Sequence, residues 1–377
     1  MKNYNIALIP GDGIGPEIIH EGVKVLDAAA RLEDVSLQYT QFPWGSDYYL
    51  ETGTVVPESG FEQLKKYDSI YFGAAGDPRI SPGIIEHQLI LAMRTELDQY
   101  VNLRPVKLLP NVHSPIEGAK NVEIYMVREN TEDFYIRTGA KYDEVQTTNH
   151  YSAKVKRGIY QVNFEVASLY SGEGQYAFNL GLVTEKGTER VARYTFELAR
   201  KKGKNKVTII TKRNAVPQMY SVWEDVFFEI AKDYPEIQAE KVNVDAAAMY
   251  LTKNPENFQV ILAPNLFGDI LSDLTAEICG GLGFAGSGNI NPEGVSMFEP
   301  IHGSAPKYKG MDVVNPVAMI LAGALMMEHL GETALAVRIG RAVENAMASG
   351  RIRSKDMGGD SSTSEIGDIV VEYLDKE

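Results

Sequence analysis

The sequence predicts an α/β protein in which strands and helices alternate along the chain. Short apolar runs typical of buried strands recur between longer segments whose apolar residues repeat at helical spacing. This alternation is typical of a sheet covered by helices. The length of 377 residues suggests about two domains with a sizeable core.

The predicted elements begin with a strand at residues 5–9, which leads into a glycine-rich turn at 11–17. Pro16 suits the first turn of the following helix, and Glu17 suits the positive end of its dipole. The turn has the spacing GxGxGP and not GxGxxG, so a structural turn beside a ligand and a direct ligand contact both stay open. Further strands are predicted at 35–42, 69–73, 122–127, 207–211 and 258–263. Helices are predicted at 16–31, 84–98, 187–202, 219–233 and 316–330.

A stretch at about residues 138–183 is rich in Tyr, Gly, Asn and Ser and lacks a helical period. We expect it to form loops and short strands that project from the main body. The sequence contains no internal repeat and no low-complexity tract.

The composition is that of an ordinary globular protein, with 44% hydrophobic and 23% charged residues. A net charge of −14 argues against nucleic-acid and anionic-membrane partners. The single cysteine, Cys279, fits a reducing compartment and is expected to be a packed core residue. The apolar run at 5–9 is too short for a signal peptide, and the one at 316–327 is too short to span a bilayer, so we expect a cytoplasmic protein.

Residues 265–283 predict an amphipathic helix that ends at a glycine cluster. Asp269 and Asp273 lie one turn apart, so their carboxylates project from one face and repel each other unless a cation lies between them. Mg²⁺ and Mn²⁺ suit such oxygen ligands. A solvated acidic face is the alternative. The apolar positions at helical spacing are Phe267, Ile270, Leu271, Leu274 and Ile278.

Three arginines stand at the ends of predicted elements: Arg94 on a helix, Arg104 in an extended segment and Arg128 after a strand. Each one alone is typical of a surface ion pair. Three in an acidic protein favour a carboxylate-binding cluster, because guanidinium groups pair with carboxylates in a bidentate manner.

Two further segments carry polar side chains after apolar runs. Lys212 follows the strand at 207–211, and Asp245 follows another short apolar run. A lysine at a strand end is often only solvated, but near a metal and other cations its pKa can fall far enough for it to act as a base. Residues 298–308 combine small residues with His302, which suits a loop close to a phosphate-bearing ligand.

These segments together resemble the β-decarboxylating hydroxyacid dehydrogenases, which include isopropylmalate, isocitrate, homoisocitrate and tartrate/D-malate dehydrogenases. The resemblance covers nearly the whole chain, with the motifs in the same order. The matching segments are 9–17 (IPGDGIGPE), 102–105 (NLRP), 128–132 (RENTE), 265–273 (NLFGDILSD), 302–306 (HGSAP) and 315–316 (NP).

The resemblance implies a homodimer of two-domain subunits with the isopropylmalate dehydrogenase-like fold, in which a mixed sheet is shared and no Rossmann fold is present. A large cofactor-binding domain would combine 1–99 with 280–377. A small domain at 100–279 would carry the dimer contacts, including the arm at about 138–183.

The resemblance also implies roles for the site residues. Asp269 would bind Mg²⁺ or Mn²⁺ together with Asp245 of the partner subunit, and Asp273 would lie beside or on the ion. Lys212 would carry away the hydroxyl proton, and Tyr135 would protonate the carbanion left by decarboxylation. The substrate carboxylates would be bound by Arg94, Arg104 and Arg128.

The cofactor would lie against the loop that follows residue 301. His302, Gly303, Ser304 and Ala305 would hold its adenosine portion, and Asn315 would contact the adenine. Family members that use NAD commonly have an acidic residue directly after the HGSAP motif. This chain has Lys307 and Tyr308 there, as in NADP-using isocitrate dehydrogenases, so we expect NADP to be preferred over NAD.

The substrate's variable group would be read by residues that precede Arg94. Ile90 and Leu91 resemble the Leu-Leu pair of the isopropylmalate and tartrate/D-malate enzymes, whereas the polar contacts for a third carboxylate are missing at Gln88 and Ile90. The expected substrate is therefore isopropylmalate, D-malate or a tartrate-like diacid, with isocitrate or homoisocitrate as the alternative.

Two functions of other classes fit the sequence less well. A non-catalytic regulatory homologue that binds ligand is expected to lack part of the acid-base and metal set, and this chain has all of it. A phosphohydrolase built on the Asp pair explains neither the three arginines nor the loop at 302–308.

Overall fold

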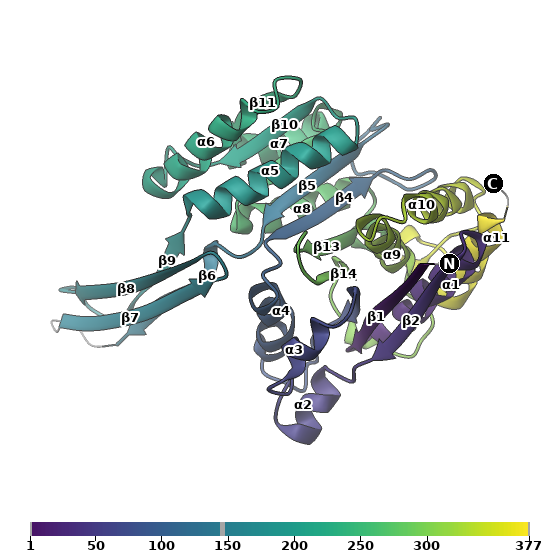
Figure 1. The fold of residues 1–377 in the computed structure, drawn as a ribbon, viewed down its shortest axis with the longest axis horizontal. Coiled ribbons are helices and arrows are strands. Elements are labelled where there is room, and N and C mark those ends of the chain that lie inside the picture. The colour runs from purple at the N-terminus through teal and green to yellow at the C-terminus, as the bar shows by residue number, and fades with distance from the viewer. Residues whose placement is uncertain (1, 144–147, 376–377) are drawn as a thin grey trace.

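The centre of the protein is a ten-stranded mixed sheet with the strand order β11-β10-β12-β5-β4-β13-β14-β3-β1-β2 (Figure 1). The computed structural model describes residues 2–143 and 148–375. The strands of this sheet are β1 (Lys2–Gly11), β2 (Val35–Gln41), β3 (Ser69–Ala74), β4 (Val101–Lys107), β5 (Glu123–Glu129), β10 (Lys206–Thr211), β11 (Gln238–Asn243), β12 (Val260–Ala263), β13 (Gly286–Ile290) and β14 (Ser296–Pro300).

Helices cover both faces of the sheet (Figure 1). They are α1 (Gly15–Leu32), α2 (Ser46–Thr52), α3 (Gly60–Leu64), α4 (Leu91–Glu96), α5 (Glu185–Lys201), α6 (Pro217–Ala231), α7 (Val244–Lys253), α8 (Asn265–Ile278), α9 (Val317–His329), α10 (Thr333–Ala348) and α11 (Thr363–Leu374). The α/β fold class is therefore confirmed. Among the described residues, no helix is both long and apolar enough to cross a membrane.

The predicted strands and helices all form, within two residues of the expected ends except at β1, which begins three residues earlier, and at residues 84–98. A π-helix at Glu86–Ile90 precedes α4 there, so the predicted single helix consists of a π-helical segment followed by an α-helical one. A π-turn shifts the following side chains around the helix axis and is frequent at functional sites. Local periodicity did not indicate this shift.

The middle of the sheet is antiparallel, whereas its two ends are parallel. β4 pairs antiparallel with β5 and with β13, and β13 pairs antiparallel with β14. The strands on the β11 side come from residues 101–263, and those on the β2 side come from both ends of the chain. The division into a domain of 1–99 plus 280–377 and a domain of 100–279 stays a prediction.

Side chains of β4 and β5 alternate between the two faces of the sheet. Leu103 and Val127 belong to the core that includes α5 and α9. Met126 belongs to a second core with α7 and α8, and its neighbour across the ladder, Arg104, contacts α8. The two faces at this point therefore carry different clefts.

The stretch expected to form loops and short strands is an arm of regular strands that projects from the main body (Figure 1). β6 (Asp133–Tyr142) pairs with β9 (Tyr176–Leu182), and β7 (Thr148–Arg157) pairs with β8 (Tyr160–Leu169). Exposed and half-buried residues alternate along β8, as in a strand with one covered face. The expected projection is confirmed, but the expected irregularity is wrong because polar and aromatic residues here occupy alternating positions of long strands.

The glycine-rich turn after β1 is packed too tightly for any other residue. A Cβ atom at Gly11 would lie 1.9 Å from the Ala74 carbonyl oxygen, and one at Gly13 would lie 2.0 Å from that of Ser304. Asp12 accepts hydrogen bonds from the Ser46 backbone and hydroxyl groups at 2.7 and 2.8 Å. The turn therefore joins three segments, which supports its structural reading.

Candidate active site

Helix α8 presents Asp269 and Asp273 one turn apart. At its start, the Asp133 carboxylate accepts a hydrogen bond from the Leu266 backbone N–H at 2.8 Å, which satisfies one of the free donors of a helix N-terminus. At its end, Gly280 adopts a φ of +104°, which favours glycine and terminates the helix. The predicted helix and its glycine stop are confirmed.

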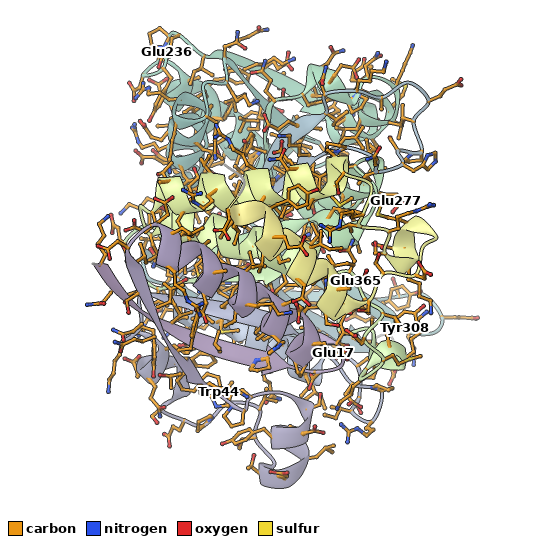
Figure 2. All side chains as sticks on the ribbon, turned by 90° about the vertical axis from the view of Figure 1, so that its right-hand side faces the viewer. Glu17, Trp44, Glu236, Glu277, Tyr308 and Glu365 are labelled. Atoms are coloured by element: carbon orange, nitrogen blue, oxygen red, sulfur yellow. The ribbon has the colours of Figure 1, made fainter. Side chains whose placement is uncertain are left out.

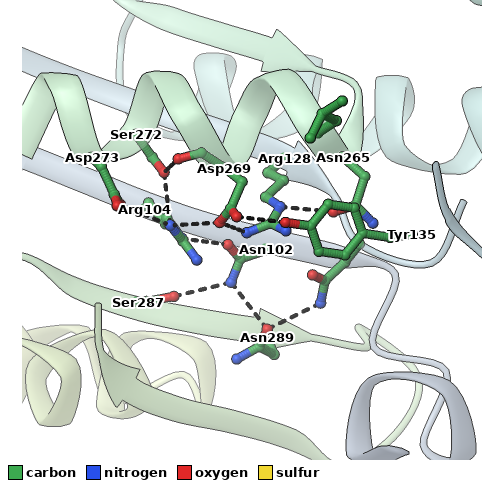
Figure 3. Close-up of polar contacts among 12 residues, drawn as sticks. Asn102, Arg104, Arg128, Tyr135, Asn265, Asp269, Ser272, Asp273, Ser287 and Asn289 are labelled. Atoms are coloured by element: carbon green, nitrogen blue, oxygen red, sulfur yellow. Dashed lines mark hydrogen bonds and ion pairs between the residues drawn. The ribbon is translucent and has the colours of Figure 1, made fainter. Parts of the chain in front are cut away.

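Arg104 of β4 lies between the two carboxylates (Figure 3). Its Nη1 is 3.5 Å from Oδ1 of Asp269 and 3.5 Å from Oδ1 of Asp273. The same nitrogen donates to the Ser272 hydroxyl at 2.7 Å, and Nε donates to Asn102 at 2.6 Å. Within one chain, the cation that separates the aspartates is thus a guanidinium group.

Arg128 of β5 forms an ion pair with Asp269 and donates from Nε to Asn265 at 2.9 Å. The Tyr135 hydroxyl donates to the other oxygen of Asp269 at 2.6 Å, and the Arg128 guanidinium lies 4.9 Å from the centre of the Tyr135 ring (Figure 3). Asp269 is therefore the point at which β5, β6 and α8 meet.

Arg94 of α4 reaches the same cluster from the other half of the sheet. Its Nη2 is 3.7 Å from Oε1 of Glu299. Its Nε and the Nη2 of Arg128 are buried, and neither has a hydrogen-bond partner among residues 2–143 and 148–375. Buried donors of this kind are rare unless a ligand or water satisfies them. Two of the three predicted arginines therefore have donors to offer.

The electrostatics of the cluster set the protonation states. Burial, followed by the charge of Arg128, lowers the pKa of Arg94 and of Arg104 to about 10, so both stay charged at neutral pH. Burial favours a raised pKa for Asp269, but the charges of Arg128 and Arg104 outweigh it and hold that pKa below its usual value. Burial raises the pKa of Asp273.

Tyr135 keeps its proton over a wide pH range. Burial, followed by the hydrogen bond to Asp269, raises the pKa of its phenol group. A protonated phenol next to a carboxylate can donate a proton to a developing carbanion.

Lys212 and Asp245 pair with each other, away from Asp269. The Lys212 Nζ is 2.8 Å from Oδ1 of Asp245, and this contact lowers the pKa of the Asp245 carboxyl group. In the part of the chain that the structure describes, no three His, Cys, Asp or Glu side chains gather as a metal site. One chain thus brings Asp269 and Asp273 together but leaves Asp245 apart.

The predicted cofactor loop borders a pocket of about 260 Å³. His302, Asn315, Tyr308 and Ala305 line this pocket together with Lys355. The Nε2 of His302 is buried and has no partner among the described residues, and burial lowers the pKa of its imidazole. A neutral histidine with a free ring nitrogen suits contact with a nucleoside.

The neighbouring residues of this loop divide into structural and exposed ones. Ser304 is buried and donates to the Gly76 carbonyl at 2.6 Å. Gly303 and Lys307 are exposed. Glu17 accepts a hydrogen bond from the Asp312 backbone at 3.0 Å, which ties the segment after Tyr308 to α1 (Figure 2).

Tyr308 lies between two amines. The Lys307 Nζ is 4.7 Å and the Lys355 Nζ is 4.8 Å from the centre of its ring. Lys355 was not predicted as a site residue, because it lies far from the HGSAP motif in the sequence.

A second pocket, of about 300 Å³, adjoins Tyr135. Leu91 and Arg94 line it, whereas Ile90 packs against the hydrophobic core around Phe72. Arg137 and His87 also line this pocket and were not among the predicted site residues. Arg137 follows Tyr135 by two residues, which could have indicated that both side chains lie on one face of a strand. No local pattern linked Arg137 to His87.

The chain belongs to the isocitrate/isopropylmalate dehydrogenase family, whose model matches residues 5–370. It is a dehydrogenase that acts on a hydroxyl group with oxidative decarboxylation of a small hydroxy acid. The family in general depends on Mg²⁺ or Mn²⁺ and on NAD or NADP.

Relatives of this chain have more than one named substrate. It is 38% identical over 379 residues to the 3-isopropylmalate dehydrogenase of Clavibacter sepedonicus, covering 99% of this chain and 98% of the relative. It is 37% identical over 380 residues to a probable tartrate dehydrogenase/decarboxylase of Bacillus subtilis (strain 168), covering 100% and 99%. The crystal structure of isocitrate dehydrogenase from Methylococcus capsulatus is similar with a TM-score of 0.84 at 33% identity, covering 98% of this chain and 99% of that one.

Proposed function

We propose that the protein oxidises and decarboxylates a malate substituted at C3, with Mg²⁺ or Mn²⁺ bound and NADP as the preferred hydride acceptor. The observation that carries this proposal is the convergence of Arg94, Arg104 and Arg128 on Asp269 next to Tyr135. The donors left without partners on Arg94 and Arg128 suit the carboxylates of a diacid.

The donor set fits a hard divalent ion. Asp269 and Asp273 offer carboxylate oxygens from side chains that are 38% and 59% exposed, and Mg²⁺ takes one or two such ligands from a protein. When bound, the ion lowers the pKa of the substrate hydroxyl group and withdraws electrons from the adjacent carboxylate. Asp245 of the partner subunit would complete this set.

A shared site requires a dimer, and the exposed surface beside α8 supports one. Met249 and Tyr250 of α7 are 55% and 47% exposed, and Ile270 of α8 is 59% exposed. The predicted apolar stripe of α8 therefore includes a residue that the single chain does not bury. Because Lys212 is the ion-pair partner of Asp245, both residues would reach the site from the same partner subunit.

The residues of the chain divide the reaction between them. Lys212 of the partner subunit would take the proton of the C2 hydroxyl group, and a bound nicotinamide would accept the C2 hydride. The carboxylate on C3 then departs as CO₂, and its electron pair stays on the substrate. Tyr135, whose proton is held by a raised pKa, donates that proton to C3. The three arginines hold the carboxylates throughout, which keeps the reacting atoms aligned.

NADP preference rests on the two amines around Tyr308. Lys307 and Lys355 are not paired with any carboxylate within ion-pair distance in the described part of the chain. Two such cations suit the extra phosphate of NADP, and the acidic acceptor that would suit the ribose of NAD is replaced by Lys307.

The experiment is a substrate and cofactor panel with Mn²⁺ present. Isopropylmalate, D-malate, tartrate, isocitrate and homoisocitrate are each assayed with NAD and with NADP by the absorbance of the reduced nicotinamide. At least one of these 2-hydroxy acids should be turned over, with a higher kcat/KM for NADP than for NAD. If none of them reduces either nucleotide, the proposal fails. If kcat/KM with NAD equals that with NADP, its cofactor part fails.

A further inference from the structure

The pocket beside Tyr135 is lined by three arginines. Arg94, Arg137 and Arg157 border its volume of about 300 Å³, and no carboxylate side chain lines it among the described residues. A concave site with several guanidinium groups and no acidic partner favours an anion. Arg94 also leaves its buried Nε without a partner here.

Arg137 is an exposed residue that borders this pocket at an irregular part of the arm. The β6–β9 ladder shifts register between Asp133 and Thr138, and the two residues that adopt positive φ there are Asp133 at +60° and Arg137 at +58°. Non-glycine residues in this region are strained, and bulges redirect side chains near functional sites. Tyr135 and Arg137 are two residues apart on β6, which places both side chains on one face of the strand, and both line the pocket.

His87 positions the Arg137 guanidinium. Nη2 of Arg137 contacts Nδ1 of His87. Arginine has only donors, so this ring nitrogen accepts and the imidazole is neutral. Burial, followed by the charge of Arg137, lowers the pKa of His87. Among residues 2–143 and 148–375, no carboxylate lies within ion-pair distance of Arg137. Its positive charge is therefore oriented and uncompensated.

The third arginine is already engaged. Arg157 donates from Nε to the Thr131 carbonyl at 2.8 Å and from Nη1 to the Lys156 carbonyl at 2.9 Å. It contributes positive charge to the pocket but fewer free donors. Arg137 is thus the cation with donors available for a ligand group beyond the two malate carboxylates.

We propose that Arg137, oriented by His87, is a specificity-determining residue that binds a third carboxylate at the end of the substrate's C3 substituent. This inference rests on the proposed function. Leu91, Ala92 and Ile136 line the same pocket and would contact the methylene groups of that substituent. The substrate class is then a tricarboxylic 2-hydroxy acid. The sequence did not indicate it because Gln88 and Ile90 stand where the isocitrate enzymes have Ser and Asn.

The first arm of the test measures turnover. The ratio of kcat/KM for isocitrate or homoisocitrate over kcat/KM for D-malate is determined for the parent, for Arg137→Gln and for Arg137→Lys. The control is Lys141→Gln, which removes one positive charge from the same strand. We expect Arg137→Gln to lower the ratio by about 10- to 100-fold, Arg137→Lys to lower it less, and Lys141→Gln to leave it unchanged.

The second arm measures binding without chemistry. Titration calorimetry compares propane-1,2,3-tricarboxylate with succinate, neither of which has a hydroxyl group to oxidise. The parent should bind the tricarboxylate more tightly, and Arg137→Gln should lose that difference. A parent enzyme that prefers isopropylmalate, or an Arg137→Gln variant with unchanged ratios in both arms, overturns the inference. Absence of all turnover with the tricarboxylate preference retained overturns only the proposed function.

Discussion

Two clefts lie on opposite faces of the central strands β4 and β5, and they differ in how their charges are satisfied. The rear cleft, on the α5, α9 and α10 side, has a volume of about 650 Å³ and is bordered by Lys107, Lys202 and Glu328. The front cluster, on the α8 side, adjoins the smaller pocket of about 300 Å³. The alternation of side chains along β4 and β5 separates the two.

Rear cations are paired across the cleft. Glu328 of α9 lies 2.7 Å from Lys202 and 3.2 Å from Lys201, and Lys107 lies 2.5 Å from Glu344 of α10. These contacts join β4 and the end of α5 to helices α9 and α10 across the rear cleft. They leave little charge for a ligand.

The arginines on the front side have hydrogen-bond donors without protein partners among the described residues. Arg94 and Arg128 each have a buried nitrogen without a partner among the described residues, and Arg137 has no carboxylate partner there. A donor left unsatisfied in a buried site costs stability, so its presence indicates a ligand that binds at that place. The two clefts therefore differ in unsatisfied charge as well as in volume, and we expect the ligand to bind on the front side.

The largest effect is expected for Asp269→Asn at the front. This change removes the carboxylate that three cations and Tyr135 surround, which is also one of the proposed metal ligands. We expect kcat/KM to fall by at least about 10³-fold, because metal stabilisation of developing charge contributes several kcal/mol. Mn²⁺ binding, measured by titration calorimetry on the same sample, should weaken in parallel. The circular dichroism spectrum should match that of the parent. Near-parental turnover would contradict the metal assignment.

A smaller effect is expected at the proposed nucleotide pocket, where Lys355, like the front arginines, has no carboxylate within ion-pair distance among the described residues. Lys355→Ala should lower kcat/KM with NADP by about 10-fold, since a charge-assisted hydrogen bond contributes about 1.5–3 kcal/mol. The value with NAD should change much less. Lys309→Ala is the matched control, because Lys309 lies 3.8 Å from Asp47. Equal losses with both nucleotides would mean that Lys355 does not read the phosphate.

The smallest effect is expected for Glu328→Gln at the rear. Burial favours a raised pKa for Glu328, but its contacts with Lys202 and Lys201 outweigh it and lower that pKa in the folded protein. A lowered acid pKa stabilises the fold above the unfolded value of about 4.5, and this contribution is lost as pH falls through the folded value.

The variant should therefore unfold at a Tm about 1–3 °C lower at pH 7, and the difference should shrink below about pH 4.5. Thermal denaturation at several pH values measures both. Its kcat/KM should stay within about twofold of the parent, because the change is on the face away from Asp269. A large loss of activity would show that the rear cleft contributes to catalysis and would break the comparison.

Much of the fold could be predicted from the sequence, because apolar periodicity and turn residues act locally. Strands β3 and β12 and helices α1, α5, α6 and α9 form where they were expected. The arm was misjudged because its alternation involves tyrosines and polar residues in place of aliphatic ones. Ile270 was placed among the apolar positions of the helix at 265–283, and the single chain leaves it exposed.

The sequence by itself determined the fold class, the family, and the arginine and aspartate residues around which the site is built. Short motifs of fixed spacing encode these features. The tertiary structure decided which of those residues meet. Arg104, which lies between Asp269 and Asp273, is 169 positions from Asp273 in the sequence. Arg137 and His87 are in contact although they are 50 positions apart. Such contacts depend on the strand order of the sheet and on how distant elements pack together, so no local pattern of residues specifies them.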